Sequence, residues 1–199
     1  MINIPPFTQA LIFDIDGTLA DTMSVHYEAC QTVCRKRGFD FPLDYFYAKA
    51  GIPTLSVFVM LMQDLHLPYD GLELGHEKEE VFLTLIDKVQ PMPIVADLAK
   101  AYYGKLPMAL GTGGGREVAS RIMEVIGMQD LFEVMITADD VLFPKPHPET
   151  FLKAAEFLKI APEYCLVFED GQPGIDAAIA GGMPYTDVRP FTPKIKYAG

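Results

Sequence analysis

Short apolar runs alternate along this chain with longer segments in which apolar residues recur at helical spacing. The short runs are nearly continuous in apolar residues, which indicates buried strands. Strands that alternate with helices form parallel sheets covered by helices on both faces. We therefore predict an α/β fold with a Rossmann-like parallel sheet. The predicted strands are residues 10–13, 107–110, 134–136 and 165–168.

The helical patterns end at recognisable stop signals. Basic residues at 35–37 precede Gly38, and two later apolar patterns end at Gly104 and Gly127. Basic residues in a last turn and a glycine just beyond it are typical of helix ends. Helices are predicted from apolar positions spaced through residues 25–33, 55–62, 81–89, 94–102, 118–126, 151–158 and 175–180.

Between the first and second predicted strands, residues 20–88 carry only helical patterns. Ligands of parallel α/β sheets bind beyond the carboxyl ends of the strands. We expect this helical segment to lie over those ends as a small inserted cap domain. The chain then divides into a core of residues 1–19 and 89–199 and a helical cap of residues 20–88.

Three further expectations concern the helical cap. Residues 55–62 are almost wholly apolar, which predicts a helix buried on most sides. Residues 77–80 are all charged, which predicts a solvated helix face. Cys30 and Cys34 lie one helical turn apart and are expected to face the core as small hydrophobic residues.

Composition and charge narrow the class of protein and its partners. Half of the 199 residues are hydrophobic and 22% are charged, which is enough for a packed core. A net charge of −11 argues against nucleic acid or an anionic membrane surface as the main partner. With no run of about 18 apolar residues, we expect no membrane-spanning helix. Residues 1–9 do not resemble a secretory signal, and three cysteines favour a reducing, cytoplasmic location.

Asp14 and Asp16 follow the first predicted strand, with Gly17 next to them to permit a sharp turn. One carboxylate can attack phosphorus, and a second can serve as general acid and then as general base. The alternatives are a plain turn or the start of a calcium-binding loop. A calcium loop needs a glutamate at about its twelfth position, where this chain has Val25.

A glycine-rich loop, residues 111–115, follows the second predicted strand. Glycines let backbone N–H groups approach an anion at the start of the next helix, and Thr112 adds a hydroxyl donor. Arg116 stands where a dinucleotide-binding loop would have its last glycine, so that motif is absent. A flexible strand-to-helix turn is the alternative.

Lys145 lies between two prolines, which hold it extended and outside a helix. A lysine fixed in this way is suited to a phosphate oxygen, although most loop lysines are simply exposed. Glu169 and Asp170 end the last predicted strand. Paired acids near Asp14 would suit Mg²⁺, and a solvated acidic turn is the alternative.

These features occur in the order Asp14-Ile-Asp16-Gly-Thr, Thr112, Lys145 and Glu169-Asp170. Here the sequence resembles the haloacid dehalogenase (HAD) superfamily of phosphohydrolases, with all four of its motifs. The resemblance spans essentially the whole chain, and the helical cap stands where that family has its small cap. A HAD-like core fold is therefore expected.

The resemblance implies roles for the acidic residues. Asp14 would be the nucleophile and a Mg²⁺ ligand. Asp16 would be the general acid and base, with its backbone carbonyl also on the metal. Asp170 would be a Mg²⁺ ligand, and Glu169 would order the metal-bound waters or Lys145.

The resemblance also implies a phosphate-binding set. Thr112 and Lys145 would bind the transferring phosphoryl group, with Gly113 and Gly114 beside the substrate. Arg116, just beyond the glycine loop, could meet a second phosphate or sugar hydroxyls.

Within the superfamily, the tail from Phe168 to Gly181 is typical of the subgroup that contains β-phosphoglucomutases and sugar-phosphate phosphatases. Residues 51–54, 107–113 and 187–189 look most like its bacterial fructose-1-phosphate phosphatase branch. The mutases generally have an arginine about where Thr54 stands and use it to hold a distal phosphate. The threonine favours simple hydrolysis, whereas Arg116 keeps the mutase reading open.

His26 lies where the mutases and their relatives often carry a histidine at the cap entrance. It could bridge cap and core or help to position Asp16. The alternative is a partly exposed helix histidine.

The resemblance thus implies Mg²⁺-dependent hydrolysis of a small phosphorylated metabolite, such as fructose 1-phosphate, through an aspartyl-phosphate. β-Phosphoglucomutase is the alternative. A dehalogenase would not need Mg²⁺, and a non-enzymatic phosphate receiver would need neither the cap nor Asp16. No sequence feature requires a dimer, so a monomer or weak homodimer is expected.

Overall fold

The computed structural model describes residues 2–191. Its main sheet has five strands in the order β5-β4-β1-β6-β7, and every neighbouring pair runs parallel. The predicted α/β class and the parallel sheet are therefore confirmed. The strands are β1 (Ala10–Phe13), β2 (Ala20–Asp21), β3 (Gln90–Pro91), β4 (Met108–Gly111), β5 (Val134–Ile136), β6 (Cys165–Glu169) and β7 (Tyr185–Asp187).

The helices follow the predicted stop signals closely. Gly38, Gly104 and Gly127 all have positive φ angles, of 81°, 72° and 67°, as expected of residues just beyond helix ends. The α-helices are α1 (Met23–Arg35), α2 (Leu43–Ala48), α3 (Thr54–Asp64), α4 (Gly71–Leu85), α5 (Pro93–Tyr102), α6 (Arg116–Val125), α7 (Glu149–Leu158) and α8 (Gln172–Ala180). Single 3₁₀ turns are η1 (Ile86–Lys88), η2 (Gln129–Leu131), η3 (Ala138–Asp140) and η4 (Pro162–Tyr164).

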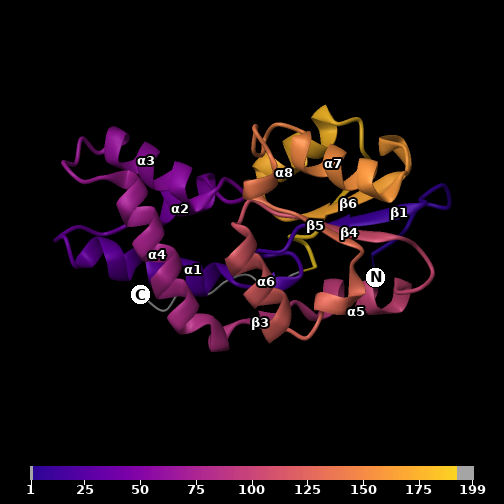
Figure 1. The fold of residues 1–199 in the computed structure, drawn as a ribbon, viewed down its shortest axis with the longest axis horizontal. Helices are drawn as coiled ribbons and strands as arrows, with labels where there is room; N and C mark the ends of the chain where they lie inside the picture. Colours follow the sequence, from indigo (N-terminus) through magenta and orange to yellow (C-terminus); the bar gives the residue numbers. More distant parts are fainter. Residues whose placement is uncertain (1, 192–199) are drawn as a thin grey trace.

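Helices cover both faces of the sheet, α5 and α6 on one side and α7 and α8 on the other (Figure 1). Successive strand side chains point to opposite faces. Leu11 and Phe13 of β1 accordingly join the core under α5 and α6. Ala10 and Ile12 join the core under α7 and α8. Burial on both faces explains why β1 is apolar at every position.

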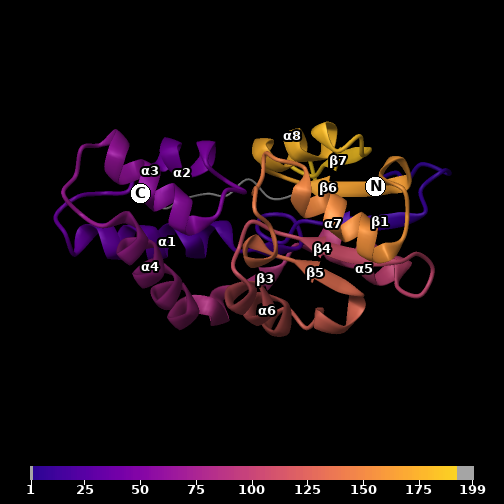
Figure 2. The same ribbon diagram turned by 45° about the horizontal axis from the view of Figure 1, so that its top comes forward.

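The helical cap forms a separate group of helices to one side of the sheet, with a core of its own (Figures 1 and 2). Cys30 and Cys34 are free thiols buried in that core, as predicted. The prediction for residues 55–62 was too strong. Helix α3 buries one stripe that includes Phe58 and Leu61, but its other positions are half-buried or exposed.

The chain enters and leaves the helical cap through a pair of very short antiparallel strands that the pattern did not predict. Strand β2 pairs with β3, with Ala20 opposite Pro91. Beside them, the N–H of Met92 donates to the carbonyl of Leu19 at 2.7 Å. The two segments that connect the core and the helical cap therefore lie side by side. The predicted cap limits, residues 20 and 88, lie next to them.

The edge strand β7 was also missed. Its three residues are only partly buried or exposed, and they mix polar and aromatic side chains, so no apolar run marks it. It pairs with β6, with Thr186 opposite Phe168. Among residues 2–191, none of the helices has the length and apolarity needed to cross a lipid bilayer.

Candidate active site

The parallel register brings the predicted site residues to one end of the sheet. Asp14 follows β1, Thr112 follows β4, and Asp170 follows β6. Lys145 lies in the loop between η3 and α7 and is only 1% exposed. The alternative of a solvent-exposed loop lysine is therefore wrong.

Lys145 is held between two carboxylates. Its Nζ donates to Oδ1 of Asp14 at 2.7 Å and to Oε2 of Glu169 at 2.7 Å. The ammonium group also lies 4.6 Å from the centre of the Phe151 ring. Burial lowers the pKa of Lys145, but the two carboxylates outweigh burial and hold the pKa above its usual value. Lys145 is thus a permanent, fixed cation.

Glu169 is fully occupied by interactions that orient it toward Lys145. Its Oε1 accepts from the backbone N–H groups of Asp170 at 3.2 Å and Gly171 at 2.9 Å. A Cβ on residue 174 would collide with this carboxylate, so the glycine of α8 makes room for it. Of the two roles expected for Glu169, these contacts match the ordering of Lys145.

The same end of the sheet holds more negative charge than Lys145 offsets. Burial and then Glu169 raise the pKa of Asp14 well above its usual value. Burial and Glu169 also raise the pKa of Asp170 to about 8. One carboxylate oxygen from each of Asp14, Glu169 and Asp170 lies within 4.8 Å of the others. An oxygen-rich cluster with excess negative charge fits a small divalent cation such as Mg²⁺.

The turn after β1 packs against Asp170. Gly17 has a φ of 81°, and a Cβ there would collide with the Asp170 carboxylate. Thr18 donates its hydroxyl to Asp170 at 3.2 Å. The glycine predicted for a sharp turn is therefore required both by the backbone and by the packing of Asp170.

Asp16 faces the helical cap. Its Oδ1 accepts from the hydroxyl of Thr22 at 2.7 Å and lies 2.9 Å from Nε2 of His26. Its Oδ2 accepts from the Thr112 hydroxyl at 3.4 Å. Burial would raise the pKa of Asp16, but His26, Thr22 and Lys78 outweigh it and lower the pKa to about 2. In this position Asp16 is ionised.

His26 connects Asp16 to a buried lysine that sequence reasoning missed. Nζ of Lys78 lies 2.6 Å from Nδ1 of His26. An ammonium group can only donate, so Nδ1 accepts and the Nε2–H of His26 donates to Asp16. The His26 ring also stacks on Phe82, with centroids 3.9 Å apart. His26 lies on α1 with a side chain that is 12% exposed, as the alternative of a partly exposed helix histidine expects, but its ring nitrogens are held by Asp16 and Lys78.

Lys78 is 2% exposed, so the prediction of a solvated face at residues 77–80 was wrong for Lys78, whereas Glu80 is exposed and Glu77 and Glu79 are half-buried. Its ammonium group also donates to Thr54 and to Glu79, each at 3.3 Å. A signal was present in the sequence. Lys78 lies four residues after Leu74 and four before Phe82, on the buried stripe of α4.

The glycine loop receives a loop of the helical cap. The N–H of Gly114 donates to the Thr112 hydroxyl at 3.0 Å. A Cβ at Gly113 would collide with the carbonyl of Gly51, and a Cβ at Gly51 would lie 3.9 Å from the Pro173 side chain. The cap loop thus rests directly on the core loops at the strand ends.

Arg116 does not reach the site. Its guanidinium donates to the carboxylate of Asp140 and to the carbonyl of Met135 at 3.1 Å. Its backbone N–H donates to Asp139 at 2.8 Å. The expected contact of Arg116 with a second phosphate or with sugar hydroxyls is therefore not supported, because the acidic turn at η3 holds this side chain.

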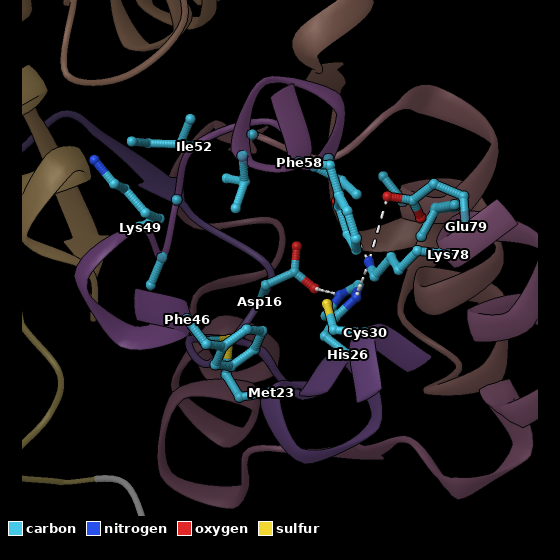
Figure 3. Close-up of a pocket in the computed structure, with 18 of the residues that line it drawn as sticks. Asp16, Met23, His26, Cys30, Phe46, Lys49, Ile52, Phe58, Lys78 and Glu79 are labelled. Carbon is cyan, nitrogen blue, oxygen red and sulfur yellow. Dashed lines mark hydrogen bonds and ion pairs between the residues drawn. The ribbon is translucent and has the colours of Figure 1, made fainter. Parts of the chain in front are cut away.

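A pocket of about 80 Å³ lies between the core loops and the helical cap. This volume holds several water molecules and therefore suits a small ligand. Figure 3 shows Asp16, His26 and Lys78 joined in a line across it, with Glu79 at the far end. The core contributes Asp14, Asp16, Gly113, Gly114, Val118, Ala119 and Ile122, and the cap contributes Met23, His26, Cys30, Phe41, Phe46, Lys49, Ala50, Gly51, Ile52, Thr54, Val57, Phe58, Lys78 and Glu79.

Comparison with known proteins agrees with this geometry. The family model of haloacid dehalogenase-like hydrolases matches residues 11–188. The fructose-1-phosphate phosphatase YqaB of Escherichia coli is 37% identical over 180 residues, which cover 90% of this chain and 95% of that protein. A phosphorylated carbohydrates phosphatase of Thermotoga maritima is 32% identical over 180 residues, which cover 88% of this chain and 82% of that protein.

Among solved structures, β-phosphoglucomutase of Clostridium difficile superposes with a TM-score of 0.82 at 25% identity. The match covers 90% of this chain and 84% of the mutase. The motifs, the fold and the relatives agree, and the chain belongs to the haloacid dehalogenase-like hydrolases.

Proposed function

We propose that this hydrolase is a Mg²⁺-dependent phosphatase of small phosphomonoesters, with sugar phosphates such as fructose 1-phosphate as substrates. The observation that carries the proposal is the buried triad in which Lys145 joins Glu169 to Asp14, and Asp14 lines the pocket. The names of the Escherichia coli and Thermotoga maritima relatives support a carbohydrate leaving group.

The proposed reaction has two steps. A carboxylate oxygen of Asp14 attacks phosphorus, and the bond from phosphorus to the leaving oxygen breaks. Asp16 gives a proton to that oxygen, which leaves as an alcohol. Asp16 then takes a proton from water, whose oxygen attacks the aspartyl-phosphate and releases phosphate and the Asp14 carboxylate. Lys145 supplies positive charge to the phosphoryl group throughout.

Asp14, Asp170 and the backbone carbonyl of Asp16 would hold the Mg²⁺ ion. When bound there, the ion would offset phosphate charge and favour the ionised form of Asp14. The carboxylates of Asp14 and Asp170 fit this role because burial and the charge of Glu169 raise the pKa of both. A divalent cation beside them would stabilise their ionised forms.

Asp16 can change role with position. Beside His26 its pKa is about 2, which keeps Asp16 ionised, the form that can accept a proton. Burial opposes its ionisation, so away from His26, toward a leaving oxygen, the pKa of Asp16 rises and the residue suits an acid. We propose that His26 and Lys78 position Asp16, and that the helical cap excludes bulk water around it.

Hydrolysis is favoured over the mutase reaction by the cap wall. By the family resemblance, Thr54 occupies the position where the mutases generally have an arginine. Its hydroxyl accepts from Lys78 and carries no positive charge for a distal phosphate. Arg116, the other candidate for a distal phosphate, pairs with Asp140. The likeness to β-phosphoglucomutase keeps that enzyme as the second candidate.

The test is phosphate release with Mg²⁺ from fructose 1-phosphate and β-glucose 1-phosphate, each with and without glucose 1,6-bisphosphate. We expect free phosphate, unaffected by the bisphosphate. Glucose 6-phosphate formed without free phosphate would identify a mutase. No product from any of these esters would contradict the sugar-phosphate assignment.

A second prediction concerns the metal-free protein. A carboxyl whose pKa is higher in the folded than in the unfolded chain binds its proton more tightly when folded. Since Asp170 has a pKa of about 8, stability without metal should decrease as the pH rises from about 4 to about 8. Asp170→Asn should remove part of this decrease.

Thermal unfolding between about pH 5 and about pH 9, with chelator or with Mg²⁺, measures both effects. Mg²⁺ should raise the melting temperature of the wild type at high pH, because it binds only the folded state, and should have little effect on Asp170→Asn. The control is Asp97→Asn, at an exposed position of α5, which should behave as wild type. Equal Mg²⁺ stabilisation of wild type and Asp170→Asn would contradict the metal assignment.

A further inference from the structure

The wall of the pocket formed by the helical cap is mainly apolar. Figure 3 shows the rings of Phe46 and Phe58 and the side chain of Ile52 around the space next to Asp16. An apolar wall offers no hydrogen bonds to a substrate, so the few polar groups on it decide which leaving groups bind well. Besides Lys49, the polar side chains of this wall form one connected patch of His26, Lys78, Glu79 and Thr54.

Most hydrogen-bonding capacity in this patch is already used. The ammonium group of Lys78 has three donors, and they go to His26, Thr54 and Glu79. Both ring nitrogens of His26 are also engaged, one with Lys78 and one with Asp16. None of these groups has a donor or ring nitrogen left for a substrate.

Glu79 is the exception. Its Oε1 accepts from Lys78, but its Oε2 is buried and has no hydrogen-bond partner among the described residues. Burial raises the pKa of Glu79, yet Lys78, His26 and Thr54 outweigh burial and hold the pKa below its usual value. A buried, ionised oxygen without a partner is unfavourable, and a donor from a ligand would relieve it.

We propose that Glu79 is a specificity-determining residue whose Oε2 accepts a hydrogen bond from a hydroxyl of the leaving group. This inference rests on the proposed phosphatase function and extends it to the choice of substrate. A hydroxyl fits better than an ammonium group, because the charge of Glu79 is already paired with Lys78, which would repel a second cation.

The charge of Glu79 has a second consequence. Lys78 pairs with Oε1 of Glu79, so an anionic group placed at Oε2 would lie against like charge on the side away from that cation and would have no hydrogen to donate. The residue therefore selects hydroxylated monophosphates and disfavours substrates with a second anionic group.

The experiment compares fructose 1-phosphate, which offers hydroxyls, with phosphoglycolate, which offers a carboxylate, and with p-nitrophenyl phosphate, which offers neither. Glu79→Gln should lower the ratio of kcat/KM for fructose 1-phosphate to that for p-nitrophenyl phosphate by about tenfold, mainly through KM. The ratio of phosphoglycolate to fructose 1-phosphate should rise. Glu79→Leu, a second variant of similar size, should change both ratios further in the same directions.

The matched control is Glu80→Gln, at the next position of α4, where the side chain is exposed, and it should leave both ratios at wild-type values. An equal fall for all three substrates in the Glu79 variants would overturn the inference, since it would mean that Glu79 only supports Lys78. Wild-type preference for phosphoglycolate over fructose 1-phosphate would overturn it as well. No hydrolysis of any ester by the wild type would instead overturn the proposed function.

Discussion

Replacement of Asp14 by asparagine should lower kcat for phosphate release by at least about 10³-fold. The amide oxygen can still accept the hydrogen bond from Lys145, but an amide does not attack phosphorus as a carboxylate does. Burial and Glu169 disfavour negative charge at this position. Without divalent cations the neutral variant should therefore melt at the wild-type temperature or above it.

Phosphate release and thermal unfolding measure the two effects separately. Asp176→Asn is the control, because Asp176 is exposed on α8 and only accepts from Gln172, and it should keep full activity. A folded Asp14→Asn variant with more than about a tenth of wild-type activity would contradict the assignment of Asp14 as nucleophile.

The surroundings of Asp14 and Asp16 oppose the protonation that the proposed first step needs. Attack requires an ionised Asp14 and a protonated Asp16, whereas burial favours the neutral form of Asp14 and His26 helps to favour the ionised form of Asp16. Charge compensation beside Asp14 and movement of Asp16 away from His26 would reverse both preferences. Under the proposed mechanism, we therefore expect the site to become reactive only after it is filled.

The position of the chemistry could be predicted from the sequence because it follows from sheet topology. The predicted bounds of β1 and β5 agree with the structure, β6 is one residue longer than predicted, and β4 is shifted by one residue at both ends. Leu11 pairs with Met108 on one side and with Leu166 on the other. Once the strands are parallel and adjacent, Asp14 and Asp170 meet at one edge.

The polar patch of the helical cap could not be predicted in the same way. Lys78 contacts His26 across 52 residues of sequence, and that contact depends on how α4 packs against α1. The charged neighbours of Lys78 hid its place on a buried stripe. Strands β2 and β3 are two residues long each, which is too short for any alternation of polar and apolar residues to be read.

Arg116 shows the opposite error, in which a motif position suggested more than the fold allows. Its place beside the glycine loop made Arg116 a candidate for binding phosphate, but the carboxylates of η3 bind it instead. Asp139 accepts from its backbone and Asp140 from its side chain. The pairing of β5 with β4 brings Asp139 and Asp140 next to the start of α6. A local sequence pattern around Arg116 does not contain this long-range contact, so it could not predict which groups Arg116 would bind.

Replacement of Lys145 by methionine should affect both stability and activity. Methionine keeps much of the side-chain volume but leaves Asp14 and Glu169 facing each other without the cation that now lies 2.7 Å from each. Removal of one partner from a buried ion pair costs about 3–5 kcal/mol of unfolding free energy. Loss of the cation beside the phosphoryl group should lower kcat by at least about 10²-fold.

A double variant separates these two roles of Lys145. Glu169→Gln keeps an oxygen for the N–H groups of Asp170 and Gly171 but removes the charge that Lys145→Met leaves unpaired. The double variant should regain much of the lost stability in denaturant titrations and none of the lost activity. Lys153→Met is the control, because Lys153 pairs with Glu149 and donates to the Asp140 carbonyl at a half-buried position, and its loss should cost no more than about 2 kcal/mol. If Lys145→Met proved as stable as Lys153→Met, the buried triad would not be the interaction that holds this end of the sheet together.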